Sequence, residues 1–270
     1  IITLKGEDLP QPQNGAPTTS DAYVGELRQE TGSLGFDGAV KFDGNADSLD
    51  LANSSDLEFG SSNFCIEAFI FPQELKNSGI VGNNQSGAPA HAGYEFDLKS
   101  DGAVTFYSGN GSAYSNTGGN LGTISAAGVI KTGQWYHLAV VRNGNTLRIY
   151  VNGNKVAENT SFSHTIASTN TKHTIGNDGV STGSSWHFNG LISNVRVVKG
   201  SAVYTANFTP PTEPLTNITN TKLLCCNSST SATAATVTPG SITANGDAFA
   251  TRNELTGSIV LGVAGISTAT

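Results

Sequence analysis

The sequence carries little charge, and this lack excludes several protein classes. Charged residues make up 13% of its 270 residues, against roughly 25% in an ordinary soluble domain. No cluster of lysine and arginine is present and the formal net charge is −7, which argues against binding to the phosphate backbone of nucleic acid. Glycine, serine, threonine and asparagine take the place of charge, a composition typical of strands and turns with a polar surface.

Long hydrophobic runs are also missing. The longest run near the end, residues 259–266, is too short to cross a bilayer, and the first five residues lack the apolar core of a signal peptide. We therefore expect no membrane insertion. Methionine is absent even at position 1, so we expect the chain to be a segment of a longer protein or a processed product.

Cysteine is scarce, with only Cys65, Cys225 and Cys226. An odd number leaves at least one thiol unpaired. The neighbours Cys225 and Cys226 are expected to point to opposite faces of a strand, which disfavours a bridge between them. Two interpretations stay open: three buried free thiols, or a bridge from Cys65 to Cys225 or Cys226. The spacing is not that of a metal site.

Short apolar runs separated by turn residues extend over residues 36–226, which is the pattern of an all-β sandwich. Before them, residues 1–35 form a proline-punctuated lead-in with a short strand expected at 24–27. After them, residues 227–270 form a tail too poor in large apolar side chains to make its own core. We expect this tail to lie extended on a neighbouring chain or to link to a further domain.

Individual strands and turns can also be predicted. Residues 64–71 alternate between two faces, with Phe64 and Ile66 on one and Cys65 and Glu67 on the other. Asn143-Gly144 and Asn152-Gly153 predict two tight turns and hence a three-stranded meander. A hairpin is expected at 94–98 and 104–107, and further strands at 173–175, 190–198 and 223–226.

Four stretches, in this order, resemble strands of laminin G-like domains with the concanavalin A-like fold. They are Phe42-Asp43-Gly44 with Asp47, residues 64–72, residues 133–142 with 150–153, and residues 188–197. The resemblance covers residues 36–226. It implies an all-β jelly-roll sandwich of two antiparallel sheets, with extended N- and C-terminal segments.

A narrower resemblance concerns residues 198–211, which are similar to a segment of laminin G-like domains in bacteriophage virion proteins, those of marine phages especially; residues 222–226 and 242–247 are similar to the same group. It implies a non-catalytic virion component: a tail fibre, a tail-associated protein or a capsid decoration. Such a protein would sit on the particle, contact other virion proteins through its terminal segments and form a homo-oligomer, for example a trimer. The alternatives are a carbohydrate-binding adhesin for host surface glycans and a secreted, extracellular module.

Catalysis is not expected. Concanavalin A-type glycoside hydrolases of the laminarinase type carry two glutamates on one strand, and the reaction needs two carboxylates that flank the scissile bond. Here Glu95-Phe96-Asp97 lacks the second glutamate. We interpret Glu95 and Asp97 as polar residues on the exposed face of a hairpin. No serine-hydrolase motif is present either.

No cofactor is expected to be required. Asp43 and Asp47 match an early acidic motif that holds calcium in many laminin G-like domains, but the late aspartate is replaced by Ser193, and Asn194 beside it offers only a neutral oxygen. Calcium prefers six to eight oxygen ligands, several of them carboxylate. We expect a calcium site at Asp43, Asp47 and Asn194 to be weak or absent, the alternative being a turn bonded by its own side chains.

A glycan site is the remaining candidate. Sugar sites combine an aromatic ring with polar groups, and glycine-rich loops on a rigid scaffold suit an adaptable rim. Three long loops, residues 82–93, 108–128 and 177–186, qualify. The candidates in or beside them are His91, Tyr114, Asn116, Asn120, Asp178, Trp186 and His187. Trp135 and His137 are predicted to be core residues, because they share one face of a strand with Ala139 and Val141.

Overall fold

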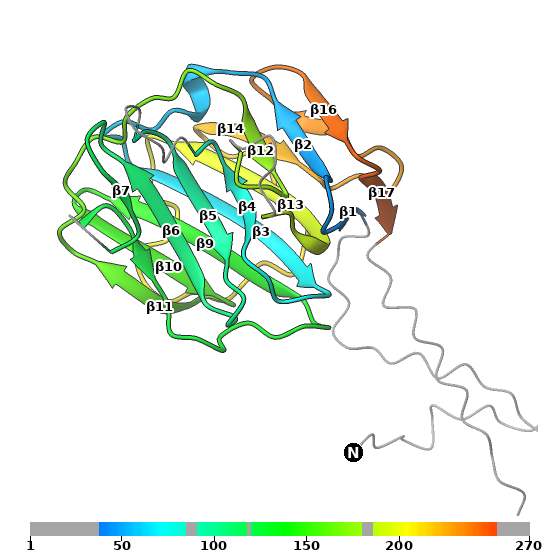
Figure 1. Ribbon diagram of the computed structural model, residues 1–270, viewed down its shortest axis with the longest axis horizontal. Coiled ribbons are helices and arrows are strands. Elements are labelled where there is room, and N and C mark those ends of the chain that lie inside the picture. Colours follow the sequence, from blue (N-terminus) through cyan, green and yellow to red (C-terminus); the bar gives the residue numbers. More distant parts are fainter. Residues whose placement is uncertain (1–37, 85–90, 118–119, 180–185, 253–270) are drawn as a thin grey trace, which may run out of the picture. The chain divides into compact units, whose positions relative to one another are not determined.

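The computed structural model describes residues 38–84, 91–117, 120–179 and 186–252 (Figure 1). Within these ranges the chain is built of strands, and the one short 3-10 helix is η2 (Ser55–Leu57). None of the described helices is long and apolar enough to cross a membrane. The lead-in and the strand expected at 24–27 lie outside the described residues.

The described strands form two antiparallel sheets. In the nine-stranded sheet A the order is β11 (Asn154–Asn159), β10 (Thr146–Val151), β9 (Tyr136–Asn143), β3 (Phe64–Pro72), β13 (Asn189–Lys199), β1 (Gly38–Asp43) and β17 (Phe249–Arg252), while β14 (Thr221–Cys225) pairs with β13 and with β15 (Ala235–Val237). In the eight-stranded sheet B the order is β16 (Ile242–Asn245), β2 (Ser48–Leu51), β12 (His173–Ile175), β4 (Ser78–Gly82), β5 (Tyr94–Leu98), β6 (Val104–Gly109) and β7 (Tyr114–Ser115), while β8 (Thr123–Ile124) pairs with β6.

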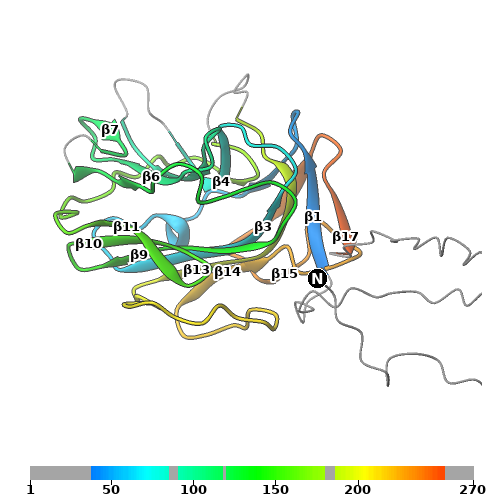
Figure 2. The same ribbon diagram turned by 90° about the horizontal axis from the view of Figure 1, so that it is seen from below.

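The two sheets pack face to face, as the edge-on view in Figure 2 shows. Side chains alternate along each strand, so every second residue enters the space between the sheets. Phe64 and Ile66 of β3 and Phe96 of β5 are fully buried there. The predicted all-β sandwich of two antiparallel sheets is confirmed.

The three-stranded meander is formed by β9, β10 and β11. Asn152 and Gly153 both have positive φ, 47° and 75°, as the predicted tight turn requires. The other turn lies one residue later than predicted. Asn143 pairs with Thr146, so that Gly144 and Asn145 form the loop, with Gly144 at φ 60°.

The outer face of sheet A is covered by the chain that follows β13. Tyr204 and Phe208 of this segment stack on each other and pack, with Val198, on the strand residues Cys65 and Tyr150. In Figure 2 the segment, coloured yellow, runs beneath β9 and β13. Sheet A is thus buried on both sides along its centre.

A buried ionic network holds this segment in place. Glu67 of β3 is fully buried, and its Oε1 accepts two hydrogen bonds from Arg196 of β13, at 2.8 and 2.7 Å. Its Oε2 accepts a hydrogen bond from the Tyr204 hydroxyl at 2.8 Å and lies 3.1 Å from Nε2 of His137. Burial raises the pKa of Glu67, but bonding to His137 and the positive charges of His137 and Arg196 hold that pKa below its usual range.

His137 and Trp135 do not lie between the sheets. Tyr136 and Leu138 point into the space between the sheets, so His137 points to the outer face of sheet A. Trp135 precedes β9, is half-buried and packs on Phe71. The prediction that His137 is a core residue on the strand face of Ala139 and Val141 is confirmed, and that face packs in a second, smaller core outside sheet A.

Over residues 235–252 the tail pairs with the sheets of its own chain. Its three strands extend the sandwich itself: β15 pairs with β14, β16 with β2 and β17 with β1. The tail lacks the apolar residues for a core, but a sheet edge offers backbone hydrogen bonds that need no apolar side chain. For that reason the apolar content of the tail did not indicate this pairing.

All three cysteines are free and buried. Cys65 lies on the outer face of sheet A, whereas Cys225 and Cys226 lie between the sheets, so a bridge from Cys65 is not formed. Cys226 has φ 60°, and its sulfur is 3.6 Å from that of Cys225. The positive φ turns the two neighbours toward the same side, contrary to the expectation for a regular strand.

Replacing Glu67 with glutamine is expected to destabilise the protein strongly. The substitution leaves the guanidinium of Arg196 buried without its counter-charge, and breaking such a pair typically costs about 3–5 kcal/mol. Glu158→Gln is the matched control, since Glu158 pairs with Arg148 at the surface, where an ion pair contributes about 1 kcal/mol or less. Urea unfolding of both variants measures the difference. Equal losses would contradict the account.

Candidate functional site

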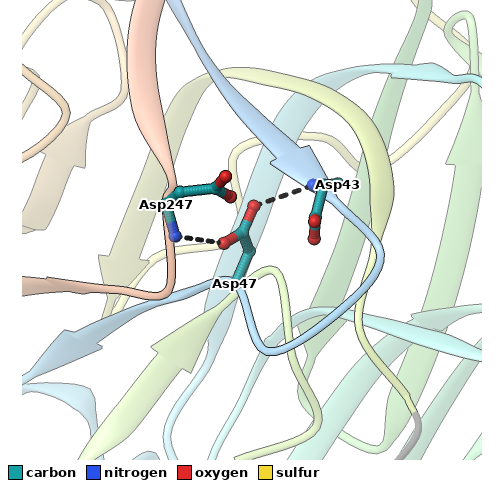
Figure 3. A group of neighbouring side chains, drawn as sticks. All are labelled: Asp43, Asp47 and Asp247. Carbon is teal, nitrogen blue, oxygen red and sulfur yellow. Dashed lines mark hydrogen bonds between the residues drawn. The ribbon is translucent and has the colours of Figure 1, made fainter.

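Two groups of acidic side chains stand out in the structure. The first, the acidic turn, consists of Asp43, Asp47 and Asp247 (Figure 3). The side chain of Asp47 is buried, and its two oxygens accept the backbone N–H groups of Asp43 and Asp247, both at 2.8 Å. The carboxylate thereby fastens the turn between β16 and β17 to the turn between β1 and β2. A Cβ at Gly246 would lie 2.2 Å from Oδ1 of Asp47, so glycine is required there.

The expected calcium ligands are only partly brought together. Asn194 is buried in β13, five residues beyond Asn189, the partner of Asp43, and its Oδ1 accepts the N–H of Leu215 at 3.0 Å. The prediction of Asn194 as a ligand is therefore wrong, and the third carboxylate comes instead from Asp247 in the tail.

The acidic turn is bonded chiefly to itself. Carboxylate oxygens of its three aspartates lie within 4.8 Å of one another. However, Asp47 already uses both oxygens for backbone groups, and Oδ1 of Asp43 accepts the N–H of Asn45 at 2.6 Å. Calcium needs six to eight oxygen ligands, so these three side chains supply only part of a shell. The arrangement fits a structural clamp better than a strong metal site.

The second group, the acidic cluster, consists of Glu95, Asp97 and Asp178 on the outer face of sheet B, which is the face turned away from sheet A. Glu95 and Asp97 alternate with the core residue Phe96, so both point outward. They are nevertheless only 2% and 0% exposed. The interpretation of these two residues as exposed is wrong, because the chain does not leave this face of the hairpin bare.

Asp178 reaches the cluster because the chain after β12 crosses closely over β4. A Cβ at Gly79 would lie 2.3 Å from the carbonyl carbon of Asn177, so only glycine permits this approach. The N–H of Gly79 donates to the carbonyl of Trp186 at 3.1 Å. The same crossing therefore brings Asp178 and Trp186, two of the predicted site residues, to the outer face of sheet B.

Aromatic rings surround the acidic cluster. Tyr107 of β6 lies directly opposite Glu95, and its ring stacks with that of Tyr114 at 6.0 Å between centroids. The ammonium of Lys99 lies 4.1 Å from the ring centroid of Trp186 and 5.3 Å from that of Tyr107. All of these side chains except the acids are half-buried. The rings of Tyr107, Tyr114 and Trp186 form an aromatic rim beside the buried acidic cluster.

The acidic cluster has hydrogen-bond acceptors that the described part of the chain does not fully use. There, both oxygens of Asp97 and Oε1 of Glu95 have no hydrogen-bond partner outside the pair, and the two carboxyl groups bond each other. Burial raises the pKa of Asp97 to about 7. Burial also raises the pKa of Glu95 well above its usual range, and the charges of Asp97 and Asp178 raise it further. Glu95 and Asp97 thus offer acceptor oxygens, and their carboxyl groups hold protons near neutral pH.

The other predicted glycan residues fall in different places. Asn116 joins the outer face, where its Nδ2 donates to Thr105 at 3.2 Å. His187 lies at the acidic turn, with Nδ1 3.0 Å from the carbonyl oxygen of Asp47. His91 sits beside the β6–β7 turn, where its carbonyl accepts the N–H of Gly111, and the carbonyl of Asn120 accepts from Asn159.

Glu95, Asp97 and Asp247 of the two groups, and Tyr107 beside them, were missed as candidate site residues. A signal existed for the first two, since two carboxylates at a spacing of two share one face of a strand. It was discounted because polar strand residues are usually solvated. Asp247 had no comparable signal, because its role depends on how the tail pairs.

A cavity of about 210 Å³ lies elsewhere, on the outer side of sheet A. It is lined by Phe69, Trp135, His137, Asn152 and residues 209–212. Its walls are mainly apolar, and it lies beside the Glu67 network. It therefore resembles a gap in the packing of the covering segment more than a polar sugar site.

Comparisons with known proteins agree with this architecture. The family model of the concanavalin A-like lectin/glucanases superfamily matches residues 43–203. Among solved structures, the chain is similar to a Bacteroides ovatus protein described as carbohydrate-binding, with 18% identity and a TM-score of 0.58, over 80% of this chain and 60% of that one. It is also similar to domains LG4-5 of the mouse laminin α1 chain, with 18% identity and a TM-score of 0.45, over 67% and 49%. No curated protein matches the chain.

Stability is expected to fall as Asp97 ionises. Its folded pKa of about 7 lies above the usual 3.8, so the folded state holds the proton more tightly, and the stabilisation present below pH 4 is lost as the pH rises to about 7. The loss is on the order of 1.4 kcal/mol per unit of pKa difference. Asp97→Asn removes this dependence, so the variant should be the more stable protein at pH 8. Thermal unfolding at pH 5 and pH 8 measures it, and parallel profiles of the two proteins would refute it.

Proposed function

Because the chain belongs to the concanavalin A-like lectin/glucanases superfamily, we propose that it is a non-catalytic carbohydrate-binding module. Its site is the outer face of sheet B around β5 and β6, which lie side by side in Figure 1. The observation that carries the proposal is the meeting of a buried acidic cluster with an aromatic rim. The absence of the second glutamate from the Glu95-Phe96-Asp97 strand supports the non-catalytic part.

The two parts of the site match the two sides of a sugar. A pyranose ring has an apolar C–H face that packs on aromatic rings, which Tyr107, Tyr114 and Trp186 provide. Its hydroxyl groups donate hydrogen bonds, and both oxygens of Asp97 and Oε1 of Glu95 are acceptors whose described partner is the neighbouring carboxyl group. A hydrogen bond is stronger where water is excluded than at an open surface. The site needs no metal in this proposal.

Glycan binding by the isolated chain tests the proposal. On a glycan array the protein should retain at least one oligosaccharide. Tyr107→Ala should weaken its binding about tenfold, since one aromatic contact contributes roughly 1 kcal/mol or more. The matched control is Phe249→Ala, because Phe249 is an exposed aromatic residue on sheet A, 55% exposed. An array without any binding, or equal loss in both variants, would refute the site.

We further propose that the module is displayed on a bacteriophage particle as a homo-oligomer, such as a trimer. The support is the resemblance of residues 198–211 and 222–226 to virion proteins. In this proposal the contacts to other virion proteins come from residues 1–35 and from residues beyond Arg252, since the tail up to that point pairs with the sandwich itself. Cryo-electron microscopy of the native particle should show both segments against neighbouring chains. A free monomer would count against it, leaving a secreted, extracellular module as the alternative.

A further inference from the structure

The cavity on the outer side of sheet A combines an aromatic interior with a polar mouth. Phe69 and His137, which line it, are each only 2% exposed. Trp135, also in its lining, is half-buried, whereas Thr209 and Thr212 are exposed. The buried rings therefore form the inner wall, and the threonine hydroxyls lie where the cavity opens to solvent.

The covering segment is fixed on both sides of the cavity, so it cannot close over the empty space. Before the cavity, the N–H of Phe208 donates to the carbonyl of Gly153 at 3.0 Å. After it, the N–H of Leu215 donates to Oδ1 of the buried Asn194, also at 3.0 Å. Between these two anchors the prolines at 210 and 211 have a fixed φ, which stiffens the wall. The cavity is thus preformed, as sites for small ligands usually are.

Size and wall chemistry indicate the kind of ligand. A dry apolar cavity of about 150 Å³ binds benzene, so a cavity of about 210 Å³ has room for a two-ring aromatic molecule. Aromatic rings gain free energy from edge-to-face contacts beyond the area that they bury. Such a contact already joins Phe69 to His137, with centroids 4.9 Å apart. A sugar fits less well, because its hydroxyl groups would lie unpaired against apolar walls.

We propose that this cavity is a second binding site, for a small aromatic molecule of two fused rings with one polar group, such as indole. The rings pack against Phe69 and Trp135, and the polar group points to the hydroxyls of Thr209 and Thr212 at the mouth. The site lies on the outer face of sheet A, whereas the proposed carbohydrate site lies on the outer face of sheet B. The two sites are therefore independent of each other.

A chemical-shift titration of the isotope-labelled chain with unlabelled indole tests the site. The chain has two tryptophans, one beside each proposed site, so their side-chain N–H signals report on the two faces separately. The signal of Trp135 should shift and saturate as indole is added, and that of Trp186 should stay in place. Calorimetry should give one bound indole per chain.

Thr209→Phe tests whether the cavity itself holds the ring, because the added phenyl group competes for the same space. It should weaken indole binding about tenfold or more, as measured by calorimetry. Thr205→Phe is the matched control, since Thr205 is exposed in the same segment but does not line the cavity, and it should leave the affinity unchanged. Both substitutions replace exposed side chains, so both variants are expected to fold.

Three results would overturn the inference: no saturable indole binding, shifts centred on Trp186, or equal affinities in the two variants. None of them touches the proposed carbohydrate site, because the glycan array and Tyr107→Ala test that site without indole. Conversely, a chain that binds indole but no glycan would retain the cavity site and lose the proposed function.

Discussion

The arrangement of the molecule depends on one fully buried carboxylate, that of Glu67. It joins β3 to Arg196 of β13, to His137 of β9 and to the Tyr204 hydroxyl in the covering segment. Buried charges are tolerated only when they are paired and hydrogen-bonded, and here every partner comes from a different element. The network therefore fixes which side of sheet A is covered. With that face occupied, the proposed ligand site lies on the outer face of sheet B, where Tyr107, Tyr114 and Trp186 remain half-buried.

The acidic cluster of sheet B is the opposite case. Glu95 and Asp97 are as buried as Glu67 but form no ion pair within the described residues, so burial raises their pKa values whereas that of Glu67 is lowered. Carboxyl groups that are equally buried in the same fold thus differ in role because of their neighbours. That of Glu67 stabilises the sandwich, whereas those of Glu95 and Asp97 are held at a cost in stability. Such a cost is common at functional sites and uncommon elsewhere.

Local chemistry made much of the fold predictable from the sequence. Asn152-Gly153 and the alternation of residues 64–71 determine their turn and strand without distant partners, and four ordered motifs indicated the sandwich. What depends on distant pairing was not predictable. The tail strands, the clamp between Asp47 and Asp247, and the second core around Tyr204 exist only because segments far apart in sequence meet. For the same reason the sequence predicted only part of the proposed site. Its candidates included Asp178, Trp186, Tyr114 and Asn116, but Glu95 and Asp97 between them were interpreted as solvated residues.

The measurement that tests the account most directly is an amide chemical-shift titration of the isotope-labelled protein with the best glycan ligand. The account predicts that the largest shifts fall on β5, β6 and the crossing residues Asn177 and Asp178. Shifts centred on the acidic turn, or on the cavity beside Trp135 on sheet A, would contradict it, because the sugar would then bind where the acidic cluster and its aromatic rim are not.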